Sequence, residues 1–570
     1  MRRAVFGSGM GCTIGWVLIV FYLGIFSAVR VHSEVTCTDL PISDLIEQLR
    51  DKVETASETR RFSCSGEMIC GISAIPAFYG ARGYRPAWCG EDGLFFAADE
   101  LIAAIGDAGS EGLSPEHYHL NRIETLLDKI RRERAMSRPV ELEPMVDLEL
   151  LLSDAFLLYG SHLLAGRVNP ETIHSSWHPH ERSGDLSSTL RSALDSGRVS
   201  SALSDLKPPH SGYRSLRRAL SRYHQLAESG GWPAVPAGPS LRIGDRNMRV
   251  PLLRQRLIRS GDLDGDVAAD QLLFDDALET AVVGFQWRHG LDPDGIVGRK
   301  TLAALNVSVA TRLRQIELNL ERWRWIPHDL GTRHVLVNIA AFHLDVVENG
   351  TTVLDMRVVA GRRYRKTPVF SREMKYLEFN PYWNIPPSLA IKDVLPHILA
   401  DPDYLARKRI RVFQGWGEGA EELDPLSIDW TRVGRRYFPY KLRQDPGPGN
   451  SLGRVKFMLP NRFSVYLHDT PKQSLFTKHS RGFSSGCIRV EKPVNLAEYL
   501  LTSHPQWDRH RILQTIDAGK RTVVVLNEPV PVHILYWTAW VDENGTVNFR
   551  DDIYRRDPPL DQALLERPPR

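Results

Sequence analysis

The sequence predicts a multi-domain α+β protein, with a mostly helical first part, a small helical bundle and a mostly β C-terminal part. The chain has 570 residues, and domains usually contain about 100–200 residues, so several domains are expected. Apolar residues recur at three-to-four spacing before residue 230, and alternation with β-branched residues replaces that spacing after residue 330. A stretch rich in proline and glycine, residues 230–239, separates the two patterns.

Composition excludes several classes of protein. The chain is 42% hydrophobic and 25% charged, as ordinary globular proteins are, which excludes disordered, collagen-like and multi-span membrane proteins. The formal net charge of +3 equals the contribution of Arg2, Arg3 and Arg30. Because the remainder is neutral, we expect no nucleic-acid partner, which would normally show as a basic excess.

Residues 1–33 predict an export segment. Arg2 and Arg3 precede the uncharged stretch Ala4–Val29, and small residues follow it, as in secretory signals. Val31-His32-Ser33 is a plausible cleavage site, but the apolar stretch nearly reaches the ~20 residues of a spanning helix. A cleaved signal and a retained N-terminal anchor both stay open. The anchor would be the only membrane contact.

The cysteines agree with export to an oxidising compartment. Four of them lie near the start of the exported chain: Cys37, Cys64, Cys70 and Cys89. They predict two disulfides, and their pairing is left open. No C-x-x-C spacing supports zinc, and no metal is expected. Cys487 is then an odd thiol, which calls for a chemical role.

Residues 34–230 form the predicted helical scaffold domain. Its clearest apolar periodicities lie at Asp99–Ala108, Arg122–Arg132, Leu142–Ala165 and Leu216–Ala227. His162 falls on the third of these and is interpreted as a packing histidine.

Residues 240–307 form a second predicted unit, a small helical bundle closed by glycine-rich turns. Its helices are expected at Met248–Ser260 and Asp275–His289, with a last turn at Arg299–Leu305. The order Phe285-Gln286, Gly290-Leu291, Asp294-Gly295, Gly298 and Thr301 to Leu305 resembles the peptidoglycan-binding module of cell-wall enzymes. The resemblance implies binding to wall glycopeptide, although such modules also serve as spacers.

Residues 330–556 form the predicted β domain. Strands are expected at His334–Ala340, His343–Glu348, Thr352–Val359, Phe463–His468, Arg521–Leu526 and Pro531–Val541. Residues 385–450 interrupt them with a long region of aromatic residues and prolines. This insertion is interpreted as a lid over a site, or as a locally packed loop.

A histidine at a strand end and a cysteine in a Ser-Gly turn form the candidate site. His468 ends one strand, and Cys487 follows Gly486. A thiolate is the reactive form of cysteine, and a neighbouring histidine can activate it. Gly486 lets the backbone approach a substrate, and Arg489 could bind a substrate carboxylate by a two-pronged contact. The alternative is a buried structural cysteine beside an unrelated histidine.

The same residues resemble the signature of the L,D-transpeptidases. In that family a histidine is followed by a Ser/Thr-x-Gly-Cys-x-Arg segment, here His468 and Ser484-Ser-Gly-Cys487-Ile-Arg489. Several further segments resemble those of the large multi-domain periplasmic members: Phe379–Pro386, Asn461, Leu467–Pro471, Phe483–Val490 and Tyr536–Val541. The resemblance is specific in the β domain and looser in the scaffold.

By this resemblance Cys487 is the nucleophile and His468 its base. The amides of Gly486 and Cys487 would form an oxyanion hole, and Arg489 would shape the turn or contact substrate. Asp469 is expected to orient the imidazole, through either its side chain or its carbonyl group. Ser485 stands where many shorter members have a histidine, and His479 is too distant along the chain to be an obvious replacement.

The resemblance implies acyl transfer on peptidoglycan stem peptides without a cofactor. A donor tetrapeptide would lose its terminal D-Ala, and an acceptor amine would resolve the thioester to give a 3→3 cross-link in the periplasm. One alternative is an L,D-carboxypeptidase with water as acceptor. Another is a non-catalytic wall-binding scaffold. A wall hydrolase of the cysteine-peptidase type would place its cysteine before its histidine, which is the opposite order.

Overall fold

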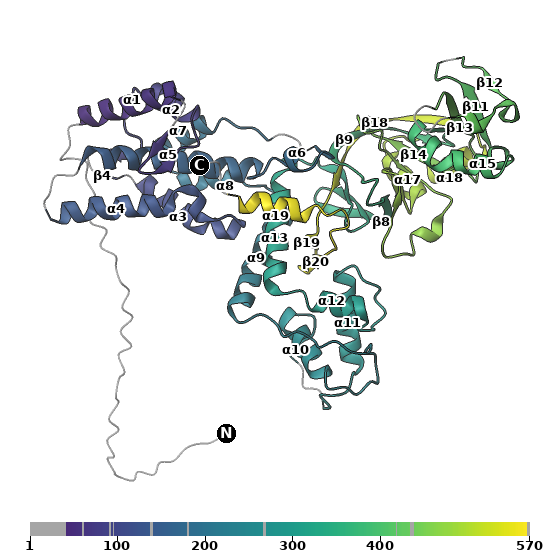
Figure 1. Ribbon diagram of the computed structural model, residues 1–570, viewed down its shortest axis with the longest axis horizontal. Coiled ribbons are helices and arrows are strands. Elements are labelled where there is room, and N and C mark those ends of the chain that lie inside the picture. The colour runs from purple at the N-terminus through teal and green to yellow at the C-terminus, as the bar shows by residue number, and fades with distance from the viewer. Residues whose placement is uncertain are drawn as a thin grey trace, which may run out of the picture.

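The computed structural model arranges a helical domain, a small helical module and a β domain along one elongated molecule (Figure 1). It describes residues 42–59, 62–90, 93–94, 96–136, 141–178, 182–265, 269–417, 419–433 and 438–566. The predicted export segment and Cys37 lie outside the described residues.

The helical domain is built around one apolar helix, α5 (Leu142–Ala165). Other helices pack around it: α1 (Ile42–Thr59), α2 (Ala74–Ala81), α3 (Phe96–Gly106), α4 (Leu120–Ala135), α7 (Leu186–Ser196) and α8 (Val199–Asp205). α5 is long and apolar enough to cross a membrane, but 78% of its most apolar window is buried in the protein. It is therefore the core helix of this domain. His162 on α5 is buried and pairs through Nδ1 with the Tyr118 hydroxyl at 3.1 Å, as a packing histidine would.

The prediction of two disulfides among the four N-terminal cysteines is wrong for Cys64 and Cys70, which are free thiols. Cys64 is buried on β1 (Ser63–Cys64), which forms a hairpin with β2 (Glu67–Met68), whereas Cys70 beyond the hairpin is exposed. The two sulfurs therefore face different surroundings. Cys89, on β3 (Cys89–Gly90), is disulfide-bonded.

Two long helices connect the helical domain to the rest of the chain. α9 (Ser211–Glu228) and α13 (Val309–Arg324) pack on each other through a shared apolar cluster. α13 was not among the predicted helices, because its buried positions include charged residues such as Arg322 and Arg324.

The module between α9 and α13 contains α10 (Val250–Ser260), α11 (Asp276–Arg288) and α12 (Arg299–Leu305) around a core of its own. Gln286 explains the Phe-Gln and Asp-Gly elements of its sequence pattern. Its buried amide donates to Asp294 Oδ1 at 2.8 Å, and its oxygen accepts from the Gly295 N–H at 2.9 Å. One side chain thus fixes the glycine-rich turn.

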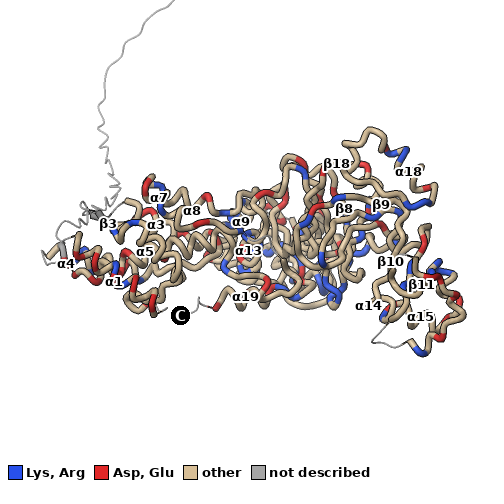
Figure 2. The backbone as a smooth tube through the Cα atoms, turned by 90° about the horizontal axis from the view of Figure 1, so that it is seen from above, with Lys and Arg blue, Asp and Glu red and all other residues tan. Residues whose placement is uncertain are grey.

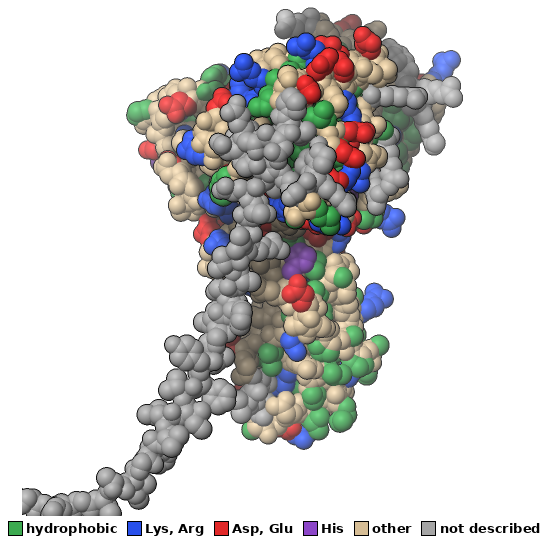
Figure 3. Space-filling model, turned by 90° about the vertical axis from the view of Figure 1, so that its left-hand side faces the viewer, with side chains coloured by type: hydrophobic (Ala, Val, Ile, Leu, Met, Phe, Trp, Pro, Cys, Tyr) green, Lys and Arg blue, Asp and Glu red, His purple; other side chains and the backbone are tan. Residues whose placement is uncertain are grey.

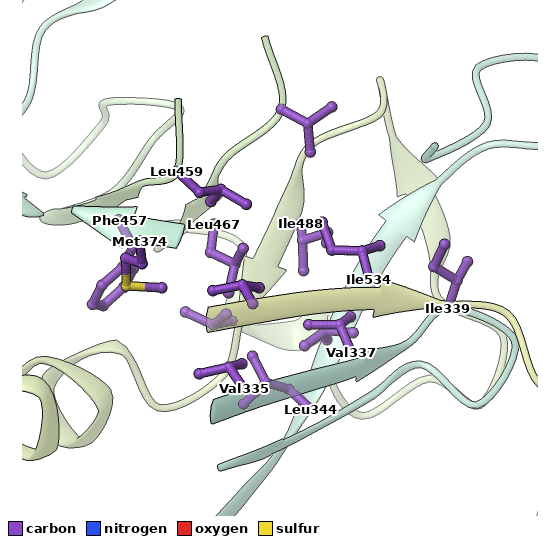
Figure 4. Close-up of a cluster of buried hydrophobic side chains, with 14 of the residues drawn as sticks. Val335, Val337, Ile339, Leu344, Met374, Phe457, Leu459, Leu467, Ile488 and Ile534 are labelled. Atoms are coloured by element: carbon purple, nitrogen blue, oxygen red, sulfur yellow. The ribbon is translucent and has the colours of Figure 1, made fainter. Parts of the chain in front are cut away.

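The strands of the β domain pair into a sheet that closes on itself. Its order is β14, β15, β17, β8, β7, β6, β18 and β9, and β9 also pairs with β14. These strands are β6 (Arg333–Asn338), β7 (His343–Glu348), β8 (Thr351–Gly361), β9 (Val369–Phe379), β14 (Val455–Met458), β15 (Leu467–His468), β17 (Ile488–Val490) and β18 (Thr522–Leu535). Buried aliphatic side chains from β6, β9, β14, β15, β17 and β18 meet inside this ring (Figure 4).

Further elements complete the β domain and link it to the helices. β16 (Gly482–Ser484) runs parallel to β8, and β19 (Ala539–Val541) pairs with β20 (Val547–Phe549). β5 (Trp177–His178), which follows α6 (Pro170–Ile173), pairs with β9 at the edge of the sheet. Two helices, α17 (Pro493–Leu500) and α18 (Arg509–Asp517), follow β17. The last helix, α19 (Asp557–Leu565), returns to lie beside α13 (Figure 1).

The region 385–450 is a folded unit rather than an irregular loop. It contributes to a separate sheet of order β10 (Trp383–Ile385), β13 (Tyr440–Gln444), β11 (Ile410–Gln414) and β12 (Glu422–Leu423). Short helices α14 (Pro387–Leu389), α15 (Leu395–Ala400) and α16 (Tyr404–Arg407) and the π-helical turn Ala390–Val394 cover it around a small apolar core.

Two strand predictions need correction. The segment Phe463–His468 was expected to be one strand, but only Leu467–His468 is extended in the sheet. The Asn461 side chain accepts the N–H groups of Phe463 and Val465 at 3.0 and 3.2 Å, and Ser464 has a φ of 54°, so the chain turns there. The two expected closing strands are largely one, β18, with a register shift between Val525 and Val530.

Charges of both signs are mixed over the described residues. Figure 2 shows Lys and Arg interspersed with Asp and Glu along the described part of the chain. The end face formed by the helical domain likewise mixes acidic, basic and apolar side chains (Figure 3).

Candidate active site

The sheet brings Cys487 and His468 to the same place. β15 and β17 are parallel neighbours, with Leu467 paired to Ile488 and His468 paired to Arg489, so Cys487 lies at the start of the strand beside the histidine. Leu467 and Ile488 point into the apolar cluster (Figure 4). Because strand side chains alternate, His468 and Arg489 face away from the core. Burial of Leu467 and Ile488 therefore fixes the register that places the site.

A main-chain carbonyl orients the imidazole of His468. Nδ1 lies 2.5 Å from the Asp469 carbonyl oxygen, so Nδ1 carries the proton and Nε2 is left as the acceptor. Burial lowers the pKa of His468 to about 3, and the positive charge of Arg489 acts in the same direction. The histidine is therefore neutral near neutral pH, as a group that accepts a thiol proton must be.

The Asp469 side chain has a different task. Its Oδ1 accepts the Thr470 N–H at 2.7 Å, and its Oδ2 accepts the Arg454 N–H at 2.8 Å. Gly453 makes room for it, because a Cβ there would lie 2.4 Å from the carboxyl carbon. The carboxylate thus holds the turn after β15, while the carbonyl group orients His468.

Hydrogen bonds within the turn 484–487 hold the candidate nucleophile. Ser484 Oγ donates to the Cys487 carbonyl at 2.5 Å and accepts the Gly486 N–H at 3.1 Å. Gly486 has a φ of +123°, which favours glycine, and its carbonyl accepts from Thr367 Oγ1 at 2.8 Å. Of the two amides expected in an oxyanion hole, that of Gly486 is thus engaged inside the turn. The Cys487 amide has no acceptor among the residues that the structure describes.

The Cys487 thiol is half-buried, and it donates to the Ser464 carbonyl at 3.8 Å rather than to His468. Burial raises the pKa of this thiol, while hydrogen bonding from Tyr466 and the charge of Lys456 lower it. The resting pair is accordingly a thiol and a neutral imidazole.

Ser485 connects the turn to the insertion. Its exposed hydroxyl accepts from Arg365 Nη1 at 2.8 Å, and Arg365 Nη2 donates to Asp393 Oδ1 at 3.0 Å. Asp393 belongs to the π-helical turn of the insertion. One arginine therefore contacts both the insertion and the residue two positions before Cys487.

Sequence reasoning missed Lys456 and Tyr466, which lie beside the pair. Lys456 on β14 is directly opposite His468, and its ammonium group lies 4.2 Å from the centroid of the Tyr466 ring. The Tyr466 ring meets the His468 ring edge-on at 5.7 Å. The available signal was a lone lysine in the short apolar strand Val455–Met458, immediately before the histidine strand.

His479 lies in the loop before the turn 484–487 and contacts the helical module. Its Nε2 lies 2.6 Å from Asp292 Oδ1. In the described part of the chain no group of three or more His, Cys, Asp or Glu side chains could hold a metal ion.

The site thus belongs to a mostly β domain with a cysteine and a histidine on neighbouring parallel strands. Residues 332–526 match the family model of the L,D-transpeptidase catalytic domain. Residues 246–305 match the "Putative peptidoglycan binding domain", and residues 73–220 match the "Scaffold domain". The chain therefore carries an L,D-transpeptidase catalytic domain together with a peptidoglycan-binding domain.

A curated relative supports this assignment. The chain is 34% identical over 272 residues to a "Putative L,D-transpeptidase" of Haemophilus influenzae, and the match covers 47% of this chain and 54% of the relative. The chain thus spans about half the length of the curated relative that it matches.

Solved structures show only remote similarity. An L,D-transpeptidase from Xylanimonas cellulosilytica is 16% identical, with a TM-score of 0.17, and the match covers 52% of this chain and 98% of that one. An L,D-transpeptidase from Mycobacterium smegmatis is 13% identical, with a TM-score of 0.16, and the match covers 36% of this chain and 58% of that one. At these TM-scores neither likeness bears on the fold or the chemistry.

Proposed function

We propose that the protein is a cysteine-dependent L,D-transpeptidase that forms 3→3 cross-links between peptidoglycan stem peptides. The observation that carries the proposal is the register of β15 and β17. It places Cys487 at the start of the strand beside His468, while the Asp469 carbonyl leaves Nε2 of that histidine free to accept a proton.

In the first half-reaction the Cys487 sulfur attacks the carbonyl carbon at the L-centre of the diamino acid in a donor tetrapeptide. The S–H proton passes to Nε2 of His468, and the C–S bond forms. The oxyanion faces the free Cys487 N–H. When the C–N bond breaks, His468 returns the proton to the amine of the departing D-Ala, and a thioester remains.

In the second half-reaction a side-chain amine of another stem attacks the thioester carbonyl. His468 removes a proton from that amine, the C–S bond breaks, and the sulfur recovers its proton. The new amide is the 3→3 cross-link. Cysteine suits this sequence because the covalent intermediate has to persist until the acceptor arrives.

Three further assignments belong to the same proposal. Arg489 contacts a substrate carboxylate, since its guanidinium lies beside His468 and its buried Nε has no partner in the described part of the chain. The peptidoglycan-binding domain brings wall glycopeptide to the site, and its contact with His479 joins it to the loop before the nucleophile turn. The enzyme works in the periplasm, after export directed by residues 1–33.

Product analysis tests the function. The purified chain is incubated with disaccharide-tetrapeptide, with Cys487→Ala alongside, and products are weighed by mass spectrometry. The proposal predicts a Cys487-dependent dimer whose mass equals that of two tetrapeptide molecules less one D-Ala. A tripeptide without dimer would indicate the carboxypeptidase, and unchanged substrate would indicate a wall-binding scaffold.

A further inference from the structure

Four charged or titratable side chains form one row across the outer face of the sheet. Register pairs Glu378 on β9 with Lys456 on β14, Lys456 with His468 on β15, and His468 with Arg489 on β17. Directly paired residues project from the same face of a sheet. His468 therefore stands between a lysine and an arginine, one on each neighbouring strand.

Neither Lys456 nor Arg489 forms an ion pair with a carboxylate among the described residues. Glu378 is already paired with Arg521, whose Nη2 lies 3.2 Å from Glu378 Oε1. Lys456 makes no hydrogen bond or ion pair among the described residues, and its ammonium group sits over the Tyr466 ring.

Arg489, like Lys456, has no carboxylate partner among the described residues. Its Nε is buried without a hydrogen bond among the described residues, and the Asp469 carboxylate, in the turn after β15, is held by the Thr470 and Arg454 amides. Arg362, in the loop after β8, adds positive charge near Arg489. Two positive charges thus flank the histidine next to the reacting sulfur, and the negative charge of Glu378 compensates that of Lys456 only in part, since Glu378 is also paired with Arg521.

We propose that Lys456, together with Arg489, stabilises the negative charge of the Cys487 thiolate and gives the site a preference for anionic, carboxylate-bearing ligands. Lys456 acts through space and over the Tyr466 ring, so it is a positioning residue. The two cations also disfavour an imidazolium at His468. The proton that Nε2 takes from the sulfur is therefore passed on readily to the departing amine. This inference deepens the proposed function, but its test does not depend on turnover.

The electrostatics of the cluster agree with this assignment. Burial lowers the pKa of Lys456 and raises that of the Cys487 thiol, and each charge opposes the effect of burial on the other group. The tenfold change in rate predicted below corresponds to about 1.36 kcal/mol.

The test measures alkylation of Cys487 in the full chain by neutral iodoacetamide and by anionic iodoacetate, from about pH 5 to pH 10. Peptide-level mass spectrometry reports Cys487 separately from Cys70. Cys70 is an exposed free thiol in the helical domain and serves as an internal reference. Lys456→Met removes the charge and Lys456→Arg keeps it. Lys441→Met is the matched control, because Lys441 also lies over an aromatic ring, that of Phe413, but in the insertion.

We expect Lys456→Met to slow iodoacetate alkylation of Cys487 about tenfold at neutral pH and to move the midpoint of its pH profile upward by about one unit. In the same variant, the ratio of the iodoacetate rate to the iodoacetamide rate at Cys487 should also fall. Lys456→Arg should stay within about threefold of the unchanged chain, and Lys441→Met and the Cys70 rates should not change. A Lys456→Met profile and ratio equal to those of the unchanged chain would overturn the inference.

A second measurement needs no variant. In the unchanged protein the iodoacetate-to-iodoacetamide ratio at Cys487 should exceed that at Cys70 and should fall as salt rises from about 20 to about 500 mM, because salt screens exposed charges. A salt-independent ratio equal to that of Cys70 would also overturn the inference. If the alkylation results hold but tetrapeptide is not turned over, the proposed function fails and this inference stands.

Discussion

At the scale of single residues, two groups of Asp469 make different contacts. Asp469 was expected to orient the imidazole, through either its side chain or its carbonyl group. The Asp469 carbonyl orients His468, and its carboxylate binds the amides of Thr470 and Arg454. The motif predicted which residue assists the histidine. It did not predict which atom acts, because that depends on the backbone path set by Gly453 and the bend at Ser464.

Asp469→Asn tests this division of tasks. The carbonyl group is unchanged, so we expect kcat to stay within about threefold, while the weakened turn lowers the free energy of unfolding by about 1 kcal/mol. His468→Gln, in contrast, should lower kcat by about 10²–10⁴-fold. Turnover assays and denaturant titrations measure both effects. A folded Asp469→Asn variant as inactive as His468→Gln would assign the orienting role to the carboxylate.

At the scale of elements, the sequence predicted those whose burial follows one simple period. Leu142–Ala165 was predicted as a helix with the bounds that the structure has, and Arg299–Leu305, expected as a last turn, is a short helix. α13 was missed because its buried face includes arginines that ion pairs satisfy, such as Arg322 with Asp557 at 2.6 Å. The sheet of the insertion was missed because its short strands pair across long segments of sequence. Pairing of that kind leaves no local pattern.

Arg365 joins the insertion to the turn 484–487, which predicts a role for this arginine in turnover. Because it bonds both Asp393 and Ser485, Arg365→Ala should release the insertion and lower tetrapeptide turnover about tenfold. Iodoacetamide alkylation of Cys487 should change by less than about twofold, since the small reagent needs no insertion.

Arg411→Ala is the matched control for Arg365→Ala. It removes a similar arginine–carboxylate pair, with Glu422, inside the insertion. The steady-state kinetic constants of this variant should equal those of the unchanged chain. Equal losses of turnover in Arg365→Ala and Arg411→Ala would show that the contact with Ser485 has no special role.

At the scale of the whole molecule, buried arginines and aromatic residues connect the domains. Arg324 of α13 donates to the Tyr213 hydroxyl on α9 at 3.1 Å. Trp177 packs edge-on against Trp325 at 5.1 Å and lies under the Arg556 guanidinium. These partners are far apart in sequence. Composition and spacing could predict the separate domains but not how they contact one another.

The histidines predict acid sensitivity of the whole fold. Burial lowers the pKa values of His162 and His468 to about 3, and those of His174, His210 and His533 to about 4. Below about pH 6.5 the unfolded chain binds more protons than the folded one. The free energy of unfolding should therefore fall on acidification by up to about 1.4 kcal/mol per pH unit for each histidine.

Three carboxyl groups among the described residues oppose this trend, because burial raises the pKa values of Glu149, Asp469 and Asp557. The pKa of Glu149 rises to about 7, so its contribution to stability is present below its ordinary pKa and is lost as the pH rises toward 7. The histidines outnumber these carboxyl groups, and denaturant midpoints should decrease steadily from about pH 6.5 to pH 4. His533→Gln should flatten that slope. Midpoints independent of pH would contradict the assignment of buried, neutral histidines.

A covalent intermediate at Cys487 is the central requirement of the proposed transpeptidase reaction. The purified chain is mixed with disaccharide-tetrapeptide, quenched in acid within the first turnovers and weighed intact, with Cys487→Ala and His468→Gln in parallel. We predict an adduct equal to the donor less D-Ala on the unchanged chain, none on Cys487→Ala and slower formation on His468→Gln. An adduct on Cys487→Ala, or cross-linked product without any adduct on the unchanged chain, would contradict the account.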